Sequence, residues 1–414
     1  MHQAEVDNSL LGAVAISSMV SLVACNAAWG GNESPQAKQT HLSKIEQVNQ
    51  GAFYTPQKLV DIAYGMIERR VTNRESFVVL DTSSGYGSFL GNEDFAVRIG
   101  GDIDPKAVAE AQRRVPSARF VLQDALVNVS RANYGLKPED RLIIVGNPPY
   151  NDTTSIIRAG IKEKVFSCDE DLKHRDMGMS FLRSYNKLKA DYICVLHPLS
   201  YLIKEANFKS IKDFTDNYKL IDALIVPSTE FSDVSKSTAF PIVIALYMRD
   251  AMGMGYEDIL NFRFRTIDKK TFSLGTWTSI GKFVQKYPNQ KKMTESNSVA
   301  KFYTLRDINA LRRSKTFMRE TKSNTVFVSS AQLKYYCYLD IFKDYIPHIP
   351  YYFGNCEPMI DDDQFHAIED CFIYASAQKH PWMNLWEDTK TPPEDFYEKI
   401  EHYFKNLLGE HYVE

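Results

Sequence analysis

The sequence predicts a three-layer α/β protein built on a doubly wound, mostly parallel sheet. Short apolar runs typical of buried strands alternate with amphipathic helical segments between residues 77 and 248. Three successive strands are followed by aspartates, and a fourth runs into Asn147-Pro148-Pro149-Tyr150. Because ligands of open α/β sheets bind outside the carboxyl ends of the strands, these polar residues predict one site at one edge of the sheet.

The length and composition of the chain indicate a globular protein with more than one domain. Its 414 residues are enough for two or three domains, and 44% hydrophobic and 24% charged residues are ordinary values. Its six cysteines include no C-x-x-C pair, which argues against a zinc ribbon or a disulfide framework and fits a reducing cytoplasm. We therefore expect a cytoplasmic protein without a metal site.

An N-terminal extension, residues 1–50, precedes the first element of the predicted sheet domain. Residues 10–28 are apolar and small, but Glu5 and Asp7 come before them and the first basic side chain is Lys38. A secretory signal needs a basic flank, and serines interrupt the run where a membrane span would be continuous. We expect a helical extension that packs on the following domain, and no membrane partner.

A capped helix is predicted just before the first strand. Residues Gln57–Arg70 carry apolar side chains on one helical face. Thr55 is expected as the N-cap and Pro56 as the first helical residue. The pattern indicates no more than a helix start, although a helix N-terminus beside Phe53 and Tyr54 can also hold a charged amino-acid group.

The first strand, Phe77–Asp81, leads into a glycine-containing loop. Gly85 and Gly87 allow a ligand to approach the backbone closely. Their spacing is not G-x-G-x-x-G and no lysine follows, so neither the dinucleotide fingerprint nor the P-loop fits. The acidic strand end suits a cationic ligand, such as the sulfonium and ammonium groups of S-adenosylmethionine.

The next two strands also end near acids. Asp102 lies 21 positions after Asp81, where an acid at the end of the second strand binds ribose hydroxyls in doubly wound sheets. Ile103 is placed to lie against an adenine ring, and Asp124 to accept from its exocyclic amine. Each acid alone fits an exposed strand end, whereas three in succession predict a shared ligand. The elements expected here are the strands Ala96–Gly101 and Phe120–Leu122 and the helix Pro105–Arg114.

The central segment is the strand Leu142–Gly146 with Asn147-Pro148-Pro149-Tyr150 after it. Neither proline can donate a backbone N–H, so the strand ends in a stiff tip rich in carbonyl groups. The side-chain oxygen of Asn147 and the carbonyl of Pro148 can accept both hydrogens of an aryl amine, and Tyr150 can stack on its ring. The alternative is a strand followed by an ordinary Pro-Pro turn.

Later apolar segments complete the predicted sheet. His197 stands at the end of one strand, and we expect it to be structural because the proposed chemistry does not need it. The expected elements are the helix Met177–Leu188 and the strands Tyr192–Pro198, Lys219–Val226 and Ala239–Met248.

Taken together, these segments resemble the DNA adenine-N6 methyltransferases of gamma motif order, a family found in type II restriction-modification systems. The resemblance covers residues 50 to 250 in the family's order, and the Asn147 motif is its most specific part. The matching segments are Phe53-Tyr54-Thr55-Pro56, Asp81 with Gly85, Gly87 and Phe89, Asp102-Ile103-Asp104-Pro105, Asp124-Ala125-Leu126, Asn147-Pro148-Pro149-Tyr150, Val195–Leu202 and Glu230-Phe231.

The resemblance implies a Rossmann-like methyltransferase domain at residues 51–250 that binds S-adenosyl-L-methionine and uses no metal. It implies catalytic roles for Asn147, Pro148 and Tyr150, with Phe231 as a second aromatic ring facing a flipped base. The cofactor-binding residues that it implies are Tyr54, Thr55, Asp81, Gly85, Gly87, Asp102, Ile103, Asp124 and Asn147.

The gamma order also implies a C-terminal target-recognition domain, here residues 251–414. Residues 259–334 contain 16 Lys and Arg against 4 Asp and Glu, whereas residues 335–414 contain 5 against 16. Basic residues interleaved with aromatic ones favour a DNA-contacting surface in the first block. The alternative is a solvated basic face balanced by the acidic tail.

The predicted function is site-specific transfer of a methyl group from S-adenosylmethionine to N6 of adenine in double-stranded DNA. A separate cognate restriction endonuclease is the expected partner, since we find no Pro-Asp...Glu-x-Lys nuclease core for a combined restriction-modification enzyme. Methylation of RNA or of a protein glutamine stays open, because the same tetrapeptide serves those substrates. A role in DNA binding alone is disfavoured by the complete Asn147-Pro148-Pro149-Tyr150.

Overall fold

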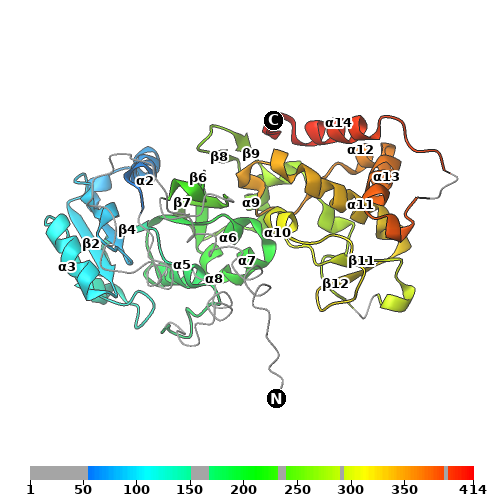
Figure 1. The fold of residues 1–414 in the computed structure, drawn as a ribbon. Coiled ribbons are helices and arrows are strands. Elements are labelled where there is room, and N and C mark those ends of the chain that lie inside the picture. Colours follow the sequence, from blue (N-terminus) through cyan, green and yellow to red (C-terminus); the bar gives the residue numbers. More distant parts are fainter. Residues whose placement is uncertain (1–54, 151–166, 232–238, 290–292, 387–389) are drawn as a thin grey trace, which may run out of the picture. The chain divides into compact units, whose positions relative to one another are not determined.

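A computed structural model describes residues 55–150, 167–231, 239–289, 293–386 and 390–414. The chain divides into two compact units (Figure 1). The first unit holds the residues up to Ile259 together with Phe264–Lys269, and the second holds Leu260–Arg263 and Lys270–Glu414. The predicted N-terminal extension, residues 1–50, lies outside the described residues.

The first unit contains a large, mostly parallel sheet. Its strands lie in the order β3-β2-β1-β4-β5-β7-β6-β8. Strands β1 to β5 all run parallel to one another, β7 runs antiparallel to both β5 and β6, and β8 is parallel to β6. The bounds are β1 Phe77–Asp81, β2 Val97–Asp102, β3 Arg119–Leu122, β4 Arg141–Gly146, β5 Tyr192–Pro198, β6 Tyr218–Pro227, β7 Pro241–Arg249 and β8 Phe264–Thr266.

The apolar runs form the centre of this sheet, which confirms the predicted α/β class. Leu142 to Val145 in β4 and Ile193 to Leu196 in β5 are fully buried. Strands buried on both faces lack the alternation of a half-exposed sheet, which is why continuous apolar runs predict them. The core thus lies around β1, β4, β5 and β7.

Helices pack against this sheet. α2 contacts β5 and β7, and α3 contacts β2 and β3. Both begin and end where the sequence predicted. The helices are α2 Gln57–Arg70, α3 Pro105–Arg114, α5 Met177–Lys187, α6 Ser200–Ile203, α7 Glu205–Ser210, α8 Lys212–Thr215 and α9 Tyr256–Asn261. Within the described residues, none of the helices combines the length and apolar character that a bilayer-spanning segment requires.

One detail of α2 corrects the sequence analysis. The helix begins at Gln57, and Pro56 rather than Thr55 is its N-cap residue, with extended φ and ψ of -55° and 142°. No side chain caps the helix. The prediction failed because Pro56 lies one position outside the first turn, so the buried Thr55 hydroxyl is too far along the chain to cap it.

The second unit has an aromatic core between helices. Tyr338 is fully buried and its ring contacts those of Phe365, Phe372 and Phe404. The sequence analysis did not predict these elements. They are β9 Thr271–Phe272, α10 Ile308–Arg313, α11 Leu333–Phe342, α12 Asp362–Ala367, α13 Glu369–Lys379 and α14 Phe396–Leu408, with the antiparallel pairs β10 Thr278–Ser279 with β13 Met359–Ile360 and β11 Ala300–Tyr303 with β12 Thr325–Val328.

Glycine at the end of β4 lets two strand ends meet closely. Gly146 has φ +144°, and a Cβ atom there would lie 2.7 Å from Oδ1 of Asp81 at the end of β1. Neither the backbone conformation nor the space admits a side chain. The carboxylate of Asp81 therefore lies directly against the β4 backbone.

We expect Gly146→Ala to lower the free energy of unfolding by about 1–3 kcal/mol, since it adds backbone strain and a steric clash. Thermal unfolding measures this. Gly91→Ala is the matched control, because Gly91 is exposed and a Cβ there meets nothing within 4 Å. Equal melting temperatures for the two variants would contradict the close packing at Gly146.

Candidate active site

The strand order brings the predicted site residues to one edge of the sheet. β3, β2, β1 and β4 are neighbours and run parallel, so their carboxyl ends lie side by side. Asp81 ends β1 and Asp102 ends β2, while Asp124 follows β3 and Asn147 follows β4. The structure therefore gathers three acids and one amide at the edge where ligands of such sheets bind.

The loop after β1 is fixed to the end of β2. The backbone N–H of Gly85 donates to Oδ2 of Asp102 at 2.8 Å, and the N–H of Asp104 donates to Oδ1 at 2.9 Å. Gly85 and Gly87 both have positive φ, 50° and 82°, which other residues rarely adopt. Burial raises the pKa of Asp102, although these two N–H groups oppose the shift. The predicted glycines thus shape a backbone cradle around Asp102.

Asp81 is a deeply buried carboxylate. Only 2% of it is exposed, and Oδ1 accepts the Ser83 N–H at 3.1 Å. No Lys, Arg or His pairs with it among the described residues. Burial raises its pKa to about 8, with a further contribution from the nearby Asp102. A cationic ligand would favour the ionised form that the protein by itself disfavours.

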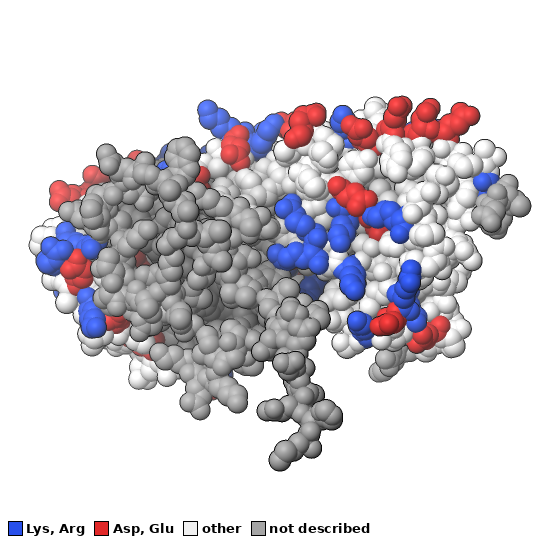
Figure 2. Space-filling model, in the orientation of Figure 1, with Lys and Arg blue, Asp and Glu red and all other residues white. Residues whose placement is uncertain are grey.

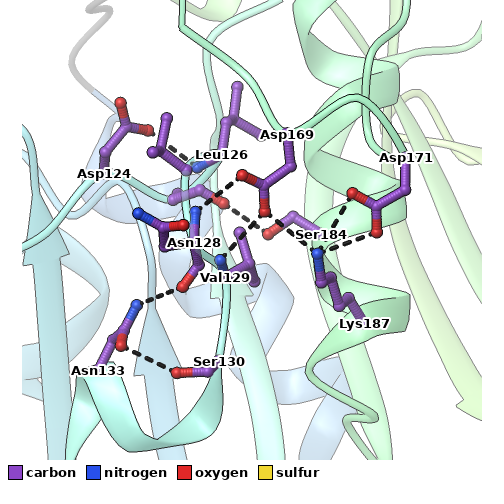
Figure 3. Close-up of polar contacts among 12 residues, drawn as sticks. Asp124, Leu126, Asn128, Val129, Ser130, Asn133, Asp169, Asp171, Ser184 and Lys187 are labelled. Atoms are coloured by element: carbon purple, nitrogen blue, oxygen red, sulfur yellow. Dashed lines mark hydrogen bonds and ion pairs between the residues drawn. The ribbon is translucent and has the colours of Figure 1, made fainter.

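Asp124 and Ile103 border this edge from β3 and β2. Oδ1 of Asp124 accepts the Leu126 N–H at 2.8 Å, which fixes the start of the loop after β3 (Figure 3). Ile103 is 68% exposed. A large apolar side chain that points into solvent beside buried carboxylates provides a surface for a flat ring.

The side chain of Asn147 has a hydrogen-bond acceptor to which no described group donates. Its side-chain oxygen Oδ1 is buried and has no hydrogen-bond partner in the described part of the chain, and the same holds for the hydroxyls of Ser83 and Ser84. Burial raises the pKa of the Tyr150 hydroxyl, and a hydrogen bond from the Asn147 side chain opposes it. The oxygen is thus left for another donor, a state that is unfavourable unless a ligand completes it.

The tetrapeptide Asn147-Pro148-Pro149-Tyr150 is closely packed. Pro148 is buried and Tyr150 is 6% exposed. A Cβ on Gly178, in the first turn of α5, would lie 2.9 Å from Cβ of Tyr150. The helix thus packs against the tyrosine, whose side chain is almost inaccessible to solvent.

Two other predicted site residues come from other parts of the first unit. Phe231 is buried in the turn after the end of β6. The preceding Glu230 forms an ion pair with Lys58 of α2 at 3.1 Å. Thr55 is buried just before that helix, and Tyr54 lies outside the described residues.

His197 is engaged within the core, as the sequence analysis expected. Its Nε2 lies 2.7 Å from the Tyr247 hydroxyl and its Nδ1 lies 3.0 Å from the Pro198 carbonyl. Burial lowers its pKa to about 4, so it is neutral at pH 7. No group of three His, Cys, Asp or Glu side chains placed to hold a metal ion occurs in the described part of the chain.

Sequence reasoning missed the small residues that make the edge compact. Gly100 and Gly101 lie in β2, where a Cβ would meet the rings of Phe120 and Tyr134 respectively. The pair of glycines immediately before the strand-end acid was the available signal. Ser83 and Ser84 were also overlooked, because a hydroxyl without a partner cannot be recognised from the sequence.

The strand order, with antiparallel β7 inserted between β5 and β6, is that of the Rossmann-like fold of S-adenosylmethionine-dependent methyltransferases. No protein-family model matches the sequence, and no curated protein matches it. Solved structures with a similar fold have low identity, so the likeness concerns the fold alone.

Three of these structures illustrate the range. One is named as a class I S-adenosylmethionine-dependent methyltransferase from Listeria monocytogenes (17% identity, TM-score 0.37, 51% of this chain and 65% of that chain). The second is a type I restriction-modification methyltransferase subunit from Streptococcus thermophilus (15%, 0.38, 52% and 47%). The third is a DrdV–DNA complex (14%, 0.41, 64% and 36%). This chain thus spans less than two thirds of each.

We expect the buried carboxyl of Asp81 to make unliganded stability fall as pH rises. Its pKa is raised from 3.8 to about 8, so the folded state favours the neutral form. This contribution is complete below pH 4 and is lost as pH approaches 8. Calorimetry of wild type and Asp81→Asn from pH 5 to pH 8 should show the wild type losing melting temperature relative to the variant. Parallel pH profiles would refute the assignment.

Proposed function

We propose that this protein is a DNA methyltransferase that transfers the methyl group of S-adenosylmethionine to N6 of adenine. The observation that carries the proposal is the buried, unpartnered Oδ1 of Asn147 at the end of β4, beside the strand-end acids. This oxygen lacks a hydrogen-bond donor, and an exocyclic amine would supply one. A nitrogen held in this way keeps its lone pair directed at an electrophile.

The residues at this edge fit the cofactor. Asp81, buried without a cation among the described residues, suits the positively charged methionine end. Asp102 suits the ribose hydroxyls, while Ile103 and Asp124 suit the adenine ring and its amine. When bound, S-adenosylmethionine supplies an electrophilic methyl group. Gly85 and Gly87 keep the loop backbone close to Asp102 and leave room for a ligand.

The protein's part in the reaction is to hold and align the amine. Oδ1 of Asn147 and the carbonyl of Pro148 accept the two hydrogens, and the prolines keep the two oxygens in a fixed relation. Tyr150 stacks on the extruded base once its ring is uncovered, and Phe231 is the proposed second aromatic. Extrusion of the base opposes the reaction by a few kcal/mol. Holding the two reacting groups in alignment, so that they need not meet at random, then supplies much of the rate acceleration.

The second unit is the proposed target-recognition part. Figure 2 shows Lys and Arg gathered over α10, α11 and the β11–β12 pair, whereas Asp and Glu line the side along α14. Some of the cations are neutralised, as in the ion pair of Lys334 with Glu369 at 2.8 Å. Others are exposed and form no ion pair among the described residues, namely Arg312, Lys315, Arg319 and Lys322.

Duplex DNA is the partner that this distribution fits. Exposed cations without carboxylate partners bind phosphates and release counterions, which gives affinity without sequence preference. Arg319 also lies over the ring of Trp382, 5.2 Å from its centroid. A separate restriction endonuclease would complete the proposed modification system. Transfer of label from tritiated cofactor to RNA or to protein, with none to duplex DNA, would replace this proposal with the alternative substrates.

Asn147→Ala should abolish methyl transfer to duplex DNA, because the amine loses its alignment, while the affinity for S-adenosylhomocysteine stays within about twofold of wild type. Asp102→Ala should instead act on cofactor binding, and reduce the affinity for the cofactor about tenfold or more. Filter-bound tritium measures transfer and calorimetry measures binding. Transfer by Asn147→Ala at the wild-type rate would sink the mechanism.

The double variant Lys315→Ala/Lys322→Ala should bind DNA more weakly and with a smaller salt dependence. Each lost phosphate contact lowers the slope of log K against log salt concentration by about 0.9. Fluorescence anisotropy at several salt concentrations measures the slope. Lys399→Ala/Lys405→Ala on α14 is the charge-matched control and should keep the wild-type slope. Equal slopes in both double variants would place the DNA elsewhere.

A further inference from the structure

Asp169 connects two segments of the first unit that the sequence analysis left unrelated. It follows the β4 motif along the chain and precedes α5. Its backbone N–H donates to the Leu126 carbonyl at 2.8 Å. Its carboxylate accepts the N–H of Asn128 at 2.9 Å and that of Val129 at 3.3 Å (Figure 3). One residue thus forms three hydrogen bonds with the backbone of the loop after β3.

A lysine of α5 completes the arrangement. Nζ of Lys187 lies 3.1 Å from Asp169 and 2.9 Å from Asp171. The Asn128 N–H, followed by Lys187, holds the pKa of Asp169 below its ordinary value, so the carboxylate is ionised at neutral pH. Asp171 binds the same lysine but forms no hydrogen bond with the loop after β3 among the described residues. Asp171 is also the more exposed of the two, with 61% of its side chain accessible against 20% for Asp169.

The loop after β3 needs external support. Asn128 has φ +51°, a left-handed conformation that asparagine tolerates better than most residues with a side chain but that is less favourable than the right-handed one. The hydrogen bond to its N–H helps to stabilise this conformation. On the other side of the loop, the buried Ser184 hydroxyl of α5 donates to the Ala125 carbonyl at 2.6 Å. The segment before α5 and the helix itself hold the loop together.

A short chain of bonds leads from Asp169 to Asp124. Leu126 accepts from the Asp169 N–H through its carbonyl, and its own N–H donates to Oδ1 of Asp124 at 2.8 Å. A shift of the Leu126 peptide would therefore move or release the Asp124 carboxylate. Asp124 is half-buried and sits at the edge proposed to bind the cofactor adenine.

We propose that Asp169 is a positioning residue that holds Asp124 where it accepts from the exocyclic amine of the cofactor adenine. The inference rests on the proposed function. Asp169 acts through the backbone of Leu126–Val129 and itself contacts no reacting atom. Through this loop, Asp169 sets the affinity of the site for the cofactor and its preference for adenine over a base without the exocyclic amine.

The test compares Asp169→Ala with Asp171→Ala in the full-length protein. Asp169→Ala keeps the backbone bond to Leu126 and removes the carboxylate bonds to Asn128 and Val129, which hold the same loop two and three positions further along. For S-adenosylhomocysteine measured by calorimetry, Asp169→Ala should bind about tenfold more weakly and Asp171→Ala within about twofold of wild type. The KM for S-adenosylmethionine should rise in parallel, while kcat at saturating cofactor changes less than about threefold. Asp169→Asn retains one acceptor oxygen and should recover part of the affinity.

A second readout separates positioning from general loosening of the fold. S-inosylhomocysteine has a carbonyl in place of the adenine amine, so the wild type should bind S-adenosylhomocysteine more tightly. In Asp169→Ala the ratio of the two affinities should be smaller and approach the ratio in Asp124→Ala. General loosening of the fold would instead weaken the binding of both ligands equally. An unchanged preference in Asp169→Ala would overturn the inference.

The outcomes also distinguish this inference from the proposed function. If the wild type binds no S-adenosylhomocysteine, the proposed function fails. If the wild type binds it and Asp169→Ala matches Asp171→Ala, only the inference fails. Thermal melting identifies a variant that does not fold, in which case Asp169→Asn carries the comparison. Lys187→Met leaves the three backbone bonds of Asp169 intact and should bind like Asp171→Ala.

Discussion

The close approach of the β4 backbone to the carboxylate of Asp81 is the constraint on which the candidate site depends. It requires glycine at position 146, and it places Asn147 next to the end of β1. It also removes Asp81 from water, which raises the pKa of the carboxyl to about 8. A cationic ligand would reverse this penalty, and a ligand that binds only the folded state stabilises it. The packing that orders the amide therefore also prepares a place for positive charge.

The features of the fold and the site that depend on local sequence could be predicted. The features that depend on contacts between residues far apart in the chain could not. The extents of α2 and α3 were predicted from their apolar faces, and Pro105 correctly marked the start of α3, whereas Pro56 proved to be the N-cap residue of α2. The acids were found because they end apolar strands. The bond from Gly85 to Asp102 spans 17 positions, and that from Asn128 to Asp169 spans 41, so no local pattern announces either. The helix α11 escaped because it buries seven consecutive residues, Tyr336 to Phe342, so its sequence shows no helical period of apolar residues.

The second unit separates its charges in a way that packing alone does not require. Acids of the C-terminal segment pair with only part of the basic block, as Glu369 does with Lys334. Surface pairs of this kind contribute little stability, so the sequence could have neutralised the remaining cations at small cost. Arg312, Lys315 and Lys322 stay exposed without ion pairs among the described residues. Such a surface repels itself unless a polyanion covers it, which favours a nucleic acid over a small molecule as the partner.

Two buried carboxylates show why the edge of the sheet is distinguished from a structural core. Asp340 in the second unit is fully buried, yet it accepts from the hydroxyls of Thr316 and Ser376 and lies 3.1 Å from Nε2 of His380. Although burial raises its pKa, His380 and Lys379 hold it below the ordinary value. Asp81 is buried as deeply, but among the described residues it has one backbone donor and no cation. An unpartnered polar atom in a protein interior is unfavourable by about 1–3 kcal/mol. The edge has several of them, namely the acceptor of Asn147 after β4 and the hydroxyls of Ser83 and Ser84 after β1. Asp340 therefore has its polar contacts completed within the protein, whereas Asn147 keeps an acceptor that a ligand would complete.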